Sequence, residues 1–145
     1  MTEVRKTIRV VAAVVERDGR YLITQRRPNA VLPLLWEFPG GKVELGESDG
    51  EALRREMTER LGVSVEVGPL ISYVSHPYEH YTVDLYLYEC VLRDPTGTRE
   101  TTRELELACH AVHAYRWVTS AEFDQYPFTP ADEASMTKLL GVDDA

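Results

Sequence analysis

A chain of 145 residues can bury a core without disulfides or a structural metal, and its size predicts one domain spanning residues 1–145. Its formal net charge of −8 argues against a general binder of nucleic-acid polymers, because clustered Lys and Arg hold phosphate backbones. The charge does not exclude a small phosphorylated ligand that a divalent metal neutralises locally.

Cysteine usage and hydrophobic runs bear on the compartment. Cys90 and Cys109 lack metal-ligand spacing and are too few for a disulfide framework, so we expect ordinary thiols in a reducing compartment. The sequence shows no apolar run behind a basic cap and no segment of membrane-spanning length. We therefore expect a cytoplasmic protein with no membrane partner, present as a monomer or homodimer.

The first residues predict strands. Residues 7–16 are β-branched and almost continuously apolar, which is typical of a central strand covered on both faces. The Asp-Gly pair at residues 18–19 predicts a hairpin turn into a second strand over about residues 20–25, so that the two strands form the first hairpin. Residues 27–35 contain two prolines and an Asn without a clean period, which indicates a surface loop beside a site.

A helix is predicted to begin at the end of the next acidic connector. Ser48, with Glu51 three residues later, is a capping box. At 100° per residue the buried stripe of this helix consists of Leu53, Met57 and Leu61. Gly62 is placed to end the helix in the left-handed conformation that glycine tolerates.

The second half of the chain predicts further strands and two more helices. The strands cover residues 64–74, 81–92, 98–107 (with the weakest apolar pattern) and 114–118, and the helices cover residues 120–123 and 131–140. Residues 94–97 indicate a turn, and Ser120 is the expected cap of the first of these helices. Together the elements predict an α+β domain in which helices cover a mixed sheet.

Acidic residues on the first helix indicate a metal and phosphate site. Glu56 lies three residues before Glu59 and four before Arg60, so all three side chains can face one edge of the core. Two carboxylates about 6 Å apart at an effective dielectric near 20 repel by roughly 3 kcal/mol, so a cation must compensate if water is excluded. Mg²⁺ does so while bridging one or two carboxylates to substrate phosphates. The backbone of Gly40 and Gly41 can approach such a site because no Cβ intervenes.

The alternative interpretation of this helix is a solvated surface. Glu51, Arg55 and Glu59 lie at four-residue steps and would then form a ladder of ion pairs. The glycine pair and Glu47, at fixed offsets from the helix, favour the metal and phosphate site instead.

These offsets resemble the Nudix box of the Nudix hydrolases. The matching positions are Gly41, Glu47, Arg55, Glu56, Met57, Glu59, Gly62 and Val63. The likeness extends to residues 23–26, 36–41, 116–118 and 126–132, and in this arrangement the chain resembles the nucleotide-sanitising branch that acts on oxidised-purine or cytidine-type nucleoside triphosphates. The resemblance implies the Nudix fold, an αβα sandwich around a mixed β-sheet. It also implies hydrolysis of a nucleoside triphosphate, or a related nucleoside diphosphate derivative, to monophosphate and pyrophosphate with Mg²⁺ or Mn²⁺.

The resemblance further implies roles for single residues. Glu56 would activate water or help to hold metal. Arg55 would orient Glu56, and Glu47 would be a supporting residue of the site. Glu59 and the carbonyl of Gly40 would be metal ligands. The candidates for substrate binding are Arg26, Gly41, Arg60, Tyr81 and Asp132. Of these, Arg26 would hold phosphate through the fork of donors that a guanidinium offers.

Base recognition falls on Asp132 and on residues 76–81. Asp132 occupies a position where the oxidised-guanine enzymes usually have Asn and a cytidine-acting relative has Asp. A carboxylate only accepts hydrogen bonds, which favours the exocyclic amine of cytosine or the N1 and N2 edge of guanine. Alternatively, Asp132 simply caps the last helix. Residues 76–81 either supply a stacking ring, for which Tyr81 is the candidate, or form only a surface turn.

Two residues depart from the family pattern. Arg60 stands where the box has the second of two paired Glu residues, and Ala111 stands where related enzymes often carry a further Glu. Three interpretations stay open. Arg60 takes the place of one metal and contacts phosphate directly; other carboxylates, such as Glu44 or Glu47, complete the site; or hydrolysis is lost and a nucleotide-binding module remains. We expect a working or weakened hydrolase, because the rest of the box survives together.

Overall fold

The computed structural model describes residues 6–93 and 107–140. Its elements in chain order are β1 (Lys6–Val14), β2 (Glu16–Arg17), β3 (Arg20–Gln25), β4 (Trp36–Glu37), β5 (Gly40–Lys42), α1 (Asp49–Leu61), β6 (Ser64–Pro77), β7 (Tyr81–Arg93), β8 (Ala114–Val118), the 3₁₀ helix η1 (Ser120–Gln125) and α2 (Pro130–Leu140). The turn expected at residues 94–97, and all but the last residue of the strand expected at 98–107, lie outside the described residues. In the described ranges no helix is long and apolar enough to cross a membrane.

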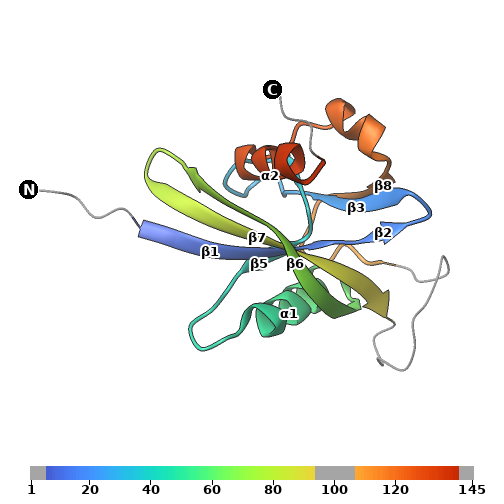
Figure 1. The fold of residues 1–145 in the computed structure, drawn as a ribbon, viewed down its shortest axis with the longest axis horizontal. Helices are drawn as coiled ribbons and strands as arrows, with labels where there is room; N and C mark the ends of the chain where they lie inside the picture. Colours follow the sequence, from blue (N-terminus) through green and yellow to red (C-terminus); the bar gives the residue numbers. More distant parts are fainter. Residues whose placement is uncertain (1–5, 94–106, 141–145) are drawn as a thin grey trace, which may run out of the picture.

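The strands form two four-stranded sheets. In the first sheet the order is β5-β1-β7-β6, with β1 parallel to β7 and antiparallel to β5. The second sheet joins β2, β3 and β4, and β8 pairs with β3. Figure 1 shows α1 on one side of the first sheet and α2 on the other. The expected α+β architecture, with helices on both faces of a mixed sheet, is therefore confirmed.

Successive residues of β1 belong to two different cores. Val11 and Ala13 pack in the cluster that contains the buried side chains of α1, whereas Ala12 and Val14 pack in the cluster that contains those of α2. Successive side chains of a strand point to opposite faces, so a strand covered on both sides is apolar throughout. This confirms the central position that the continuous apolar run predicts.

The expected first hairpin differs in the structure. The single strand predicted over residues 7–16 is divided at Val15 into β1, which belongs to the first sheet, and β2, which pairs with β3 in the second. Asp18 and Gly19 do form the predicted turn, with φ of 54° and 77°, but they join β2 to β3. The apolar pattern continues through Val15 because that residue is also buried, so composition alone does not mark the change of sheet.

The local signals of α1 are confirmed. The Ser48 hydroxyl accepts a hydrogen bond from the Glu51 amide at 3.1 Å, and the Glu51 carboxylate accepts one from the Ser48 amide at 2.9 Å. The predicted stripe of Leu53, Met57 and Leu61 is completely buried. Gly62 ends the helix with φ of 66°. In η1, by contrast, the cap is Thr119 rather than the expected Ser120, and the Thr119 amide donates to Glu122 at 2.8 Å.

We expect the capping box to contribute measurably to stability. Ser48→Ala removes the side-chain acceptor and should lower the free energy of unfolding by about 1 kcal/mol. Ser48→Gly should cost only a few tenths of a kcal/mol, since glycine is tolerated as a cap. Urea unfolding of both variants measures the difference. No loss for Ser48→Ala would show that the side-chain hydrogen bond does not stabilise α1.

Candidate active site

A pocket of about 320 Å³ lies against the face of the first sheet that α2 covers. Its apolar wall includes Ile8, Val10, Ala12, Val83 and Leu85 from β1 and β7. Its charged lining consists of Arg26, Glu37, Lys42, Arg60 and Asp132, and Gly40 and Gly41 also line it. A volume of this size falls at the lower end of the range for small-molecule sites.

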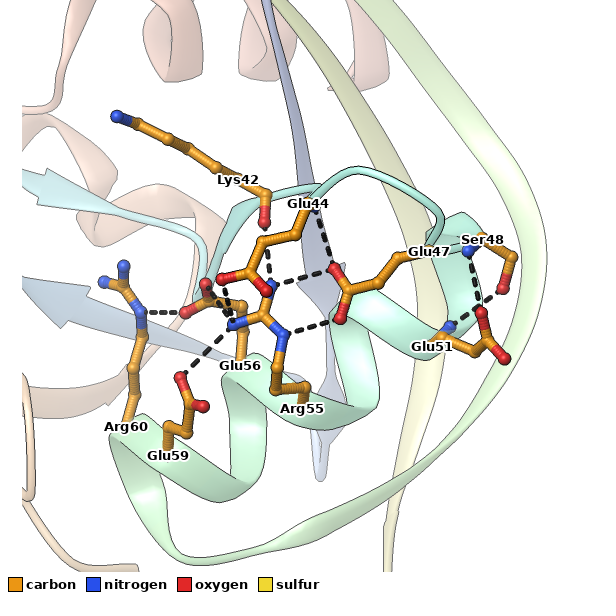
Figure 2. A network of polar contacts seen from close by, with 9 residues as sticks. All are labelled: Lys42, Glu44, Glu47, Ser48, Glu51, Arg55, Glu56, Glu59 and Arg60. Atoms are coloured by element: carbon orange, nitrogen blue, oxygen red, sulfur yellow. Dashed lines mark hydrogen bonds and ion pairs between the residues drawn. The ribbon is translucent and has the colours of Figure 1, made fainter.

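The Arg55 guanidinium holds the acidic residues of the box together (Figure 2). It donates two hydrogen bonds to Glu47, from Nε at 2.6 Å and from Nη2 at 3.0 Å. Its Nη1 donates to Glu56 at 3.0 Å and to Glu59 at 3.2 Å, and its Nη2 also donates to the carbonyl of Lys42 at 3.0 Å. The hydrogen bonds from Arg55 lower the pKa of Glu47 to about 2. Arg55 is therefore fixed in place beside Glu56.

Glu56 is buried between two guanidiniums. Arg55 donates to its Oε2, and the Nε of Arg60 donates to its Oε1 at 2.5 Å, so both carboxylate oxygens are paired (Figure 2). A Cβ built on Gly41 would lie 2.2 Å from the Glu56 Cδ, so only glycine lets the loop approach this carboxylate. A buried charge needs such partners, because its desolvation costs several kcal/mol.

Glu37 extends this ion-pair network, and sequence reasoning gave it no role. Its Oε1 accepts a hydrogen bond from the Nη1 of Arg26 at 3.1 Å, and its Oε2 lies 4.0 Å from the Nη1 of Arg60. Burial raises the pKa of the Glu37 carboxyl, while Arg26 and Arg60 act in the opposite direction. The sequence feature that could have indicated a role for Glu37 is its position between two aromatic residues, Trp36 and Phe38, both of which are buried.

Asp132 lies in the pocket wall, in the first turn of α2. Its Oδ1 accepts a hydrogen bond from the Phe38 amide at 3.0 Å, and its Oδ2 accepts one from the Thr129 hydroxyl at 2.5 Å. The Asp132 amide in turn donates to the Thr129 oxygen at 3.3 Å. Burial, followed by the nearby charge of Glu37, raises the pKa of Asp132 to about 7. The cap of α2 is therefore the Thr129 hydroxyl, so the capping alternative for Asp132 is wrong, and its role in base recognition stays a prediction.

Two tyrosines line the same pocket: Tyr78 lies in the turn between β6 and β7, and Tyr81 is the first residue of β7. The rings of Tyr78 and Tyr81 are stacked, with centroids 5.3 Å apart and an interplanar angle of 25°. The Tyr78 hydroxyl accepts a hydrogen bond from the Ala131 amide at 3.1 Å, which ties the turn to α2. The aromatic segment thus borders the pocket, and Tyr78 joins the expected Tyr81.

The side chains present fit a divalent metal only in part. In residues 6–93 and 107–140, no three His, Cys, Asp or Glu side chains are grouped so as to hold a metal ion. Mg²⁺ binds oxygen at about 2.0–2.1 Å, but the Nε of Arg60 already lies 2.5 Å from Oε1 of Glu56. A cation at that lone pair would overlap the guanidinium. Glu59 is 58% exposed and does not line the pocket, whereas Gly40 does.

Within residues 6–93 and 107–140, neither Glu44 nor Glu47 is placed to complete a metal set. Glu44 is 67% exposed and lies 3.8 Å from Arg55, and Glu47 is likewise paired with Arg55. Ala111 lies at the end of α1, where its amide donates to the carbonyl of Arg60 at 3.3 Å. Its side chain has no oxygen to offer to a metal.

Comparison with known proteins places this site in a family. A family model described as the NUDIX domain matches residues 10–138. The CTP pyrophosphohydrolase of Escherichia coli (strain K12) is 40% identical over 127 residues, covering 88% of this chain and 87% of that protein. The 8-oxo-dGTP diphosphatase of Proteus vulgaris is 31% identical over 108 residues, covering 72% of this chain and 96% of that protein.

Solved structures agree with the sequence relatives. The solution structure of the E. coli ORF135 protein matches with a TM-score of 0.75 at 32% identity, covering 95% of this chain and 91% of that one. The MutT protein from Methanosarcina mazei Go1 matches with a TM-score of 0.80 over 99% of this chain and 100% of that one, and at 18% identity this likeness concerns the fold alone. Because the family model spans most of the sequence, the chain belongs to the Nudix family.

Proposed function

We propose that the protein hydrolyses a nucleoside triphosphate to the monophosphate and pyrophosphate. One observation carries the proposal: a single pocket combines an apolar wall and stacked tyrosines, suited to a base, with Arg26, Lys42 and Arg60, suited to phosphates. The buried carboxylate of Glu56 adjoins this pocket through Arg60. The relatives named CTP pyrophosphohydrolase and 8-oxo-dGTP diphosphatase support the same reaction class.

Glu56 is assigned as the group that activates water. An ionised carboxylate has about four acceptor sites, and Arg55 and Arg60 each use one, so both oxygens keep a lone pair for a water molecule. The water oxygen attacks phosphorus, the bond to the leaving pyrophosphate breaks, and Glu56 takes the proton. Arg55 positions Glu56 through its hydrogen bonds.

Mg²⁺ or Mn²⁺ is the proposed metal. The carbonyl of Gly40, which lines the pocket, would be one protein ligand, and Glu59, which is paired with Arg55 outside the lining, would turn towards the ion to be another. Such an ion, bound together with the nucleotide, would neutralise charge on the phosphates. The remaining positive charge at the pocket comes from the protein itself, through Arg26, Lys42 and Arg60.

Base recognition is assigned to Asp132 and the tyrosine pair. Once it is ionised, above its raised pKa of about 7, the Asp132 carboxylate favours bases that present donors, such as the amine of cytosine or the N1 and N2 edge of guanine. Stacking on Tyr81, supported by Tyr78, would hold the base without specifying it. The first substrates to test are therefore cytidine and oxidised-guanosine triphosphates.

A second candidate function is that of a nucleotide-binding module, which binds the nucleotide without hydrolysing it. The observation that favours it is the incomplete metal set among the described residues. The same assay separates the two functions.

We expect pyrophosphate release from at least one member of a panel of ordinary, oxidised and methylated nucleoside triphosphates, assayed with Mg²⁺ and then with Mn²⁺. Glu56→Gln removes the acceptor of the water proton and should lower kcat by about 10²- to 10⁴-fold. Glu89→Gln, at an exposed carboxylate of β7, is the matched control and should leave kcat unchanged. Nucleotide binding without turnover on any member would identify the module instead.

Two glycine substitutions test the close approach at Glu56. Gly41→Ala would put a Cβ 2.2 Å from the Glu56 Cδ and displace the carboxylate, for which we expect a loss in kcat of about 10²-fold. Gly50→Ala is the matched change in the first turn of α1, where the new Cβ meets only the mobile end of Arg54 at 3.4 Å. Steady-state kinetics of both variants decides the matter, and equal activities would show that Glu56 does not depend on this approach.

The raised pKa of Asp132 predicts how stability depends on pH. Between 3.8 and about 7, the folded state keeps a proton that the unfolded state has released. The contribution of Asp132 to the free energy of unfolding is therefore complete below pH 3.8, and it declines as the pH rises to about 7. Asn does not titrate, so Asp132→Asn should gain stability relative to the wild type across this window. Urea unfolding across the window measures that difference, and a difference that does not change with pH would contradict the buried titration.

A further inference from the structure

Arg60 lies in the pocket wall with hydrogen-bonding capacity to spare. A guanidinium carries five N–H donors, and only the Nε of Arg60 donates to a residue that the structure describes. Its Nη1 lies 4.0 Å from the nearer Glu37 oxygen, beyond hydrogen-bonding distance. Figure 2 shows the terminal nitrogens directed away from Glu56. The other four N–H donors thus have no hydrogen-bond partner among the described residues, on a side chain that is 28% exposed.

The two carboxylates beside Arg60 each have another arginine. Glu56 is paired with Arg55 at its second oxygen, and Glu37 is paired with Arg26 at 3.1 Å. Neither carboxylate therefore needs Arg60 as its only counter-charge. Instead, Glu56 and Glu37 limit where the Arg60 guanidinium can lie. A cation held in this way is already oriented before a ligand arrives.

Arg60 is accompanied by two more cations in the same pocket. Arg26 and Lys42 also line it, in a chain whose formal net charge is −8. A planar guanidinium fork matches phosphate oxygens in geometry as well as in charge. Glu37 and Asp132 also line the pocket, so the three cations exceed its carboxylates by one, and this positive excess favours an anionic ligand in a chain of net negative charge.

We propose that Arg60 binds a nucleotide phosphate directly and supplies, as part of the chain, the positive charge that a divalent ion would need to bring beside Glu56. The Nε of Arg60, 2.5 Å from Oε1 of Glu56, occupies one of the two lone-pair positions at which a metal would contact that oxygen. The protein therefore binds nucleotide phosphates without added metal. This inference rests on the proposed function, since its ligand is the nucleotide of that reaction.

Calorimetric titration with CTP in excess EDTA tests the proposal on the whole chain. The wild type binds CTP, and Arg60→Gln weakens binding by about 10- to 100-fold, as expected for the loss of charge-assisted hydrogen bonds. Arg60→Lys keeps the positive charge and therefore loses less CTP affinity than Arg60→Gln. Arg54→Gln, at an exposed arginine of the same helix, is the matched control and leaves the affinity unchanged.

Mn²⁺ titration followed by electron paramagnetic resonance gives a second measurement, without nucleotide. Arg60→Glu puts a third carboxylate between Glu56 and Glu37, where the wild type has a cation. The Mn²⁺ dissociation constant of this variant should fall relative to the wild type, while its CTP affinity in EDTA should fall below that of Arg60→Gln. Unchanged Mn²⁺ binding would show that Arg60 does not stand in the place of a metal.

The outcomes separate this inference from the proposed function. CTP binding in EDTA that depends on Arg60, without hydrolysis of any triphosphate, supports the inference and overturns the function. Hydrolysis together with no CTP binding in EDTA overturns the inference and keeps the function. The absence of CTP binding in EDTA is measured on the wild type, so this outcome does not depend on whether any variant folds.

Discussion

The site depends on one buried carboxylate, Glu56, held between the guanidiniums of Arg55 and Arg60. A carboxylate removed from water is costly unless its charge is paired and its oxygens accept hydrogen bonds, and the two arginines meet both needs. The capping box and the buried stripe of α1 fix the register that points Glu56 inward. Gly41 then lets the loop close over it, because there is no Cβ to collide with the carboxylate.

The sheet brings this carboxylate next to the ligand pocket. On β1, the residues that face α1 alternate with Ile8, Val10 and Ala12, which line the pocket on the other face. The edge strand β5 (Gly40–Lys42) also lines the pocket and contacts α1, so only this strand lies between α1 and the pocket. Arg60 reaches the pocket at this edge. The charge of Arg60, on α1, would therefore lie within reach of a ligand bound in the pocket.

Features fixed by short stretches of chain could be predicted from the sequence, and those fixed by distant contacts could not. The capping box at Ser48, the end of α1 at Gly62 and the turn at residues 18–19 depend on neighbouring residues, and all are present. The division of the first strand at Val15 depends on which partner strands approach, which the apolar pattern does not reveal. Glu37 was missed for the same reason: its partners Arg26 and Arg60 lie 11 and 23 residues away.

The most direct test of the account is a crystal structure of the protein with a non-hydrolysable CTP analogue and Mn²⁺, with the metal located by its anomalous scattering. We expect a phosphate oxygen within hydrogen-bonding distance of the terminal nitrogens of Arg60, whose Nε still donates to Oε1 of Glu56. We also expect that no Mn²⁺ contacts that oxygen. An Arg60 side chain turned out of the pocket, with Mn²⁺ bound to Oε1 of Glu56, would contradict the account.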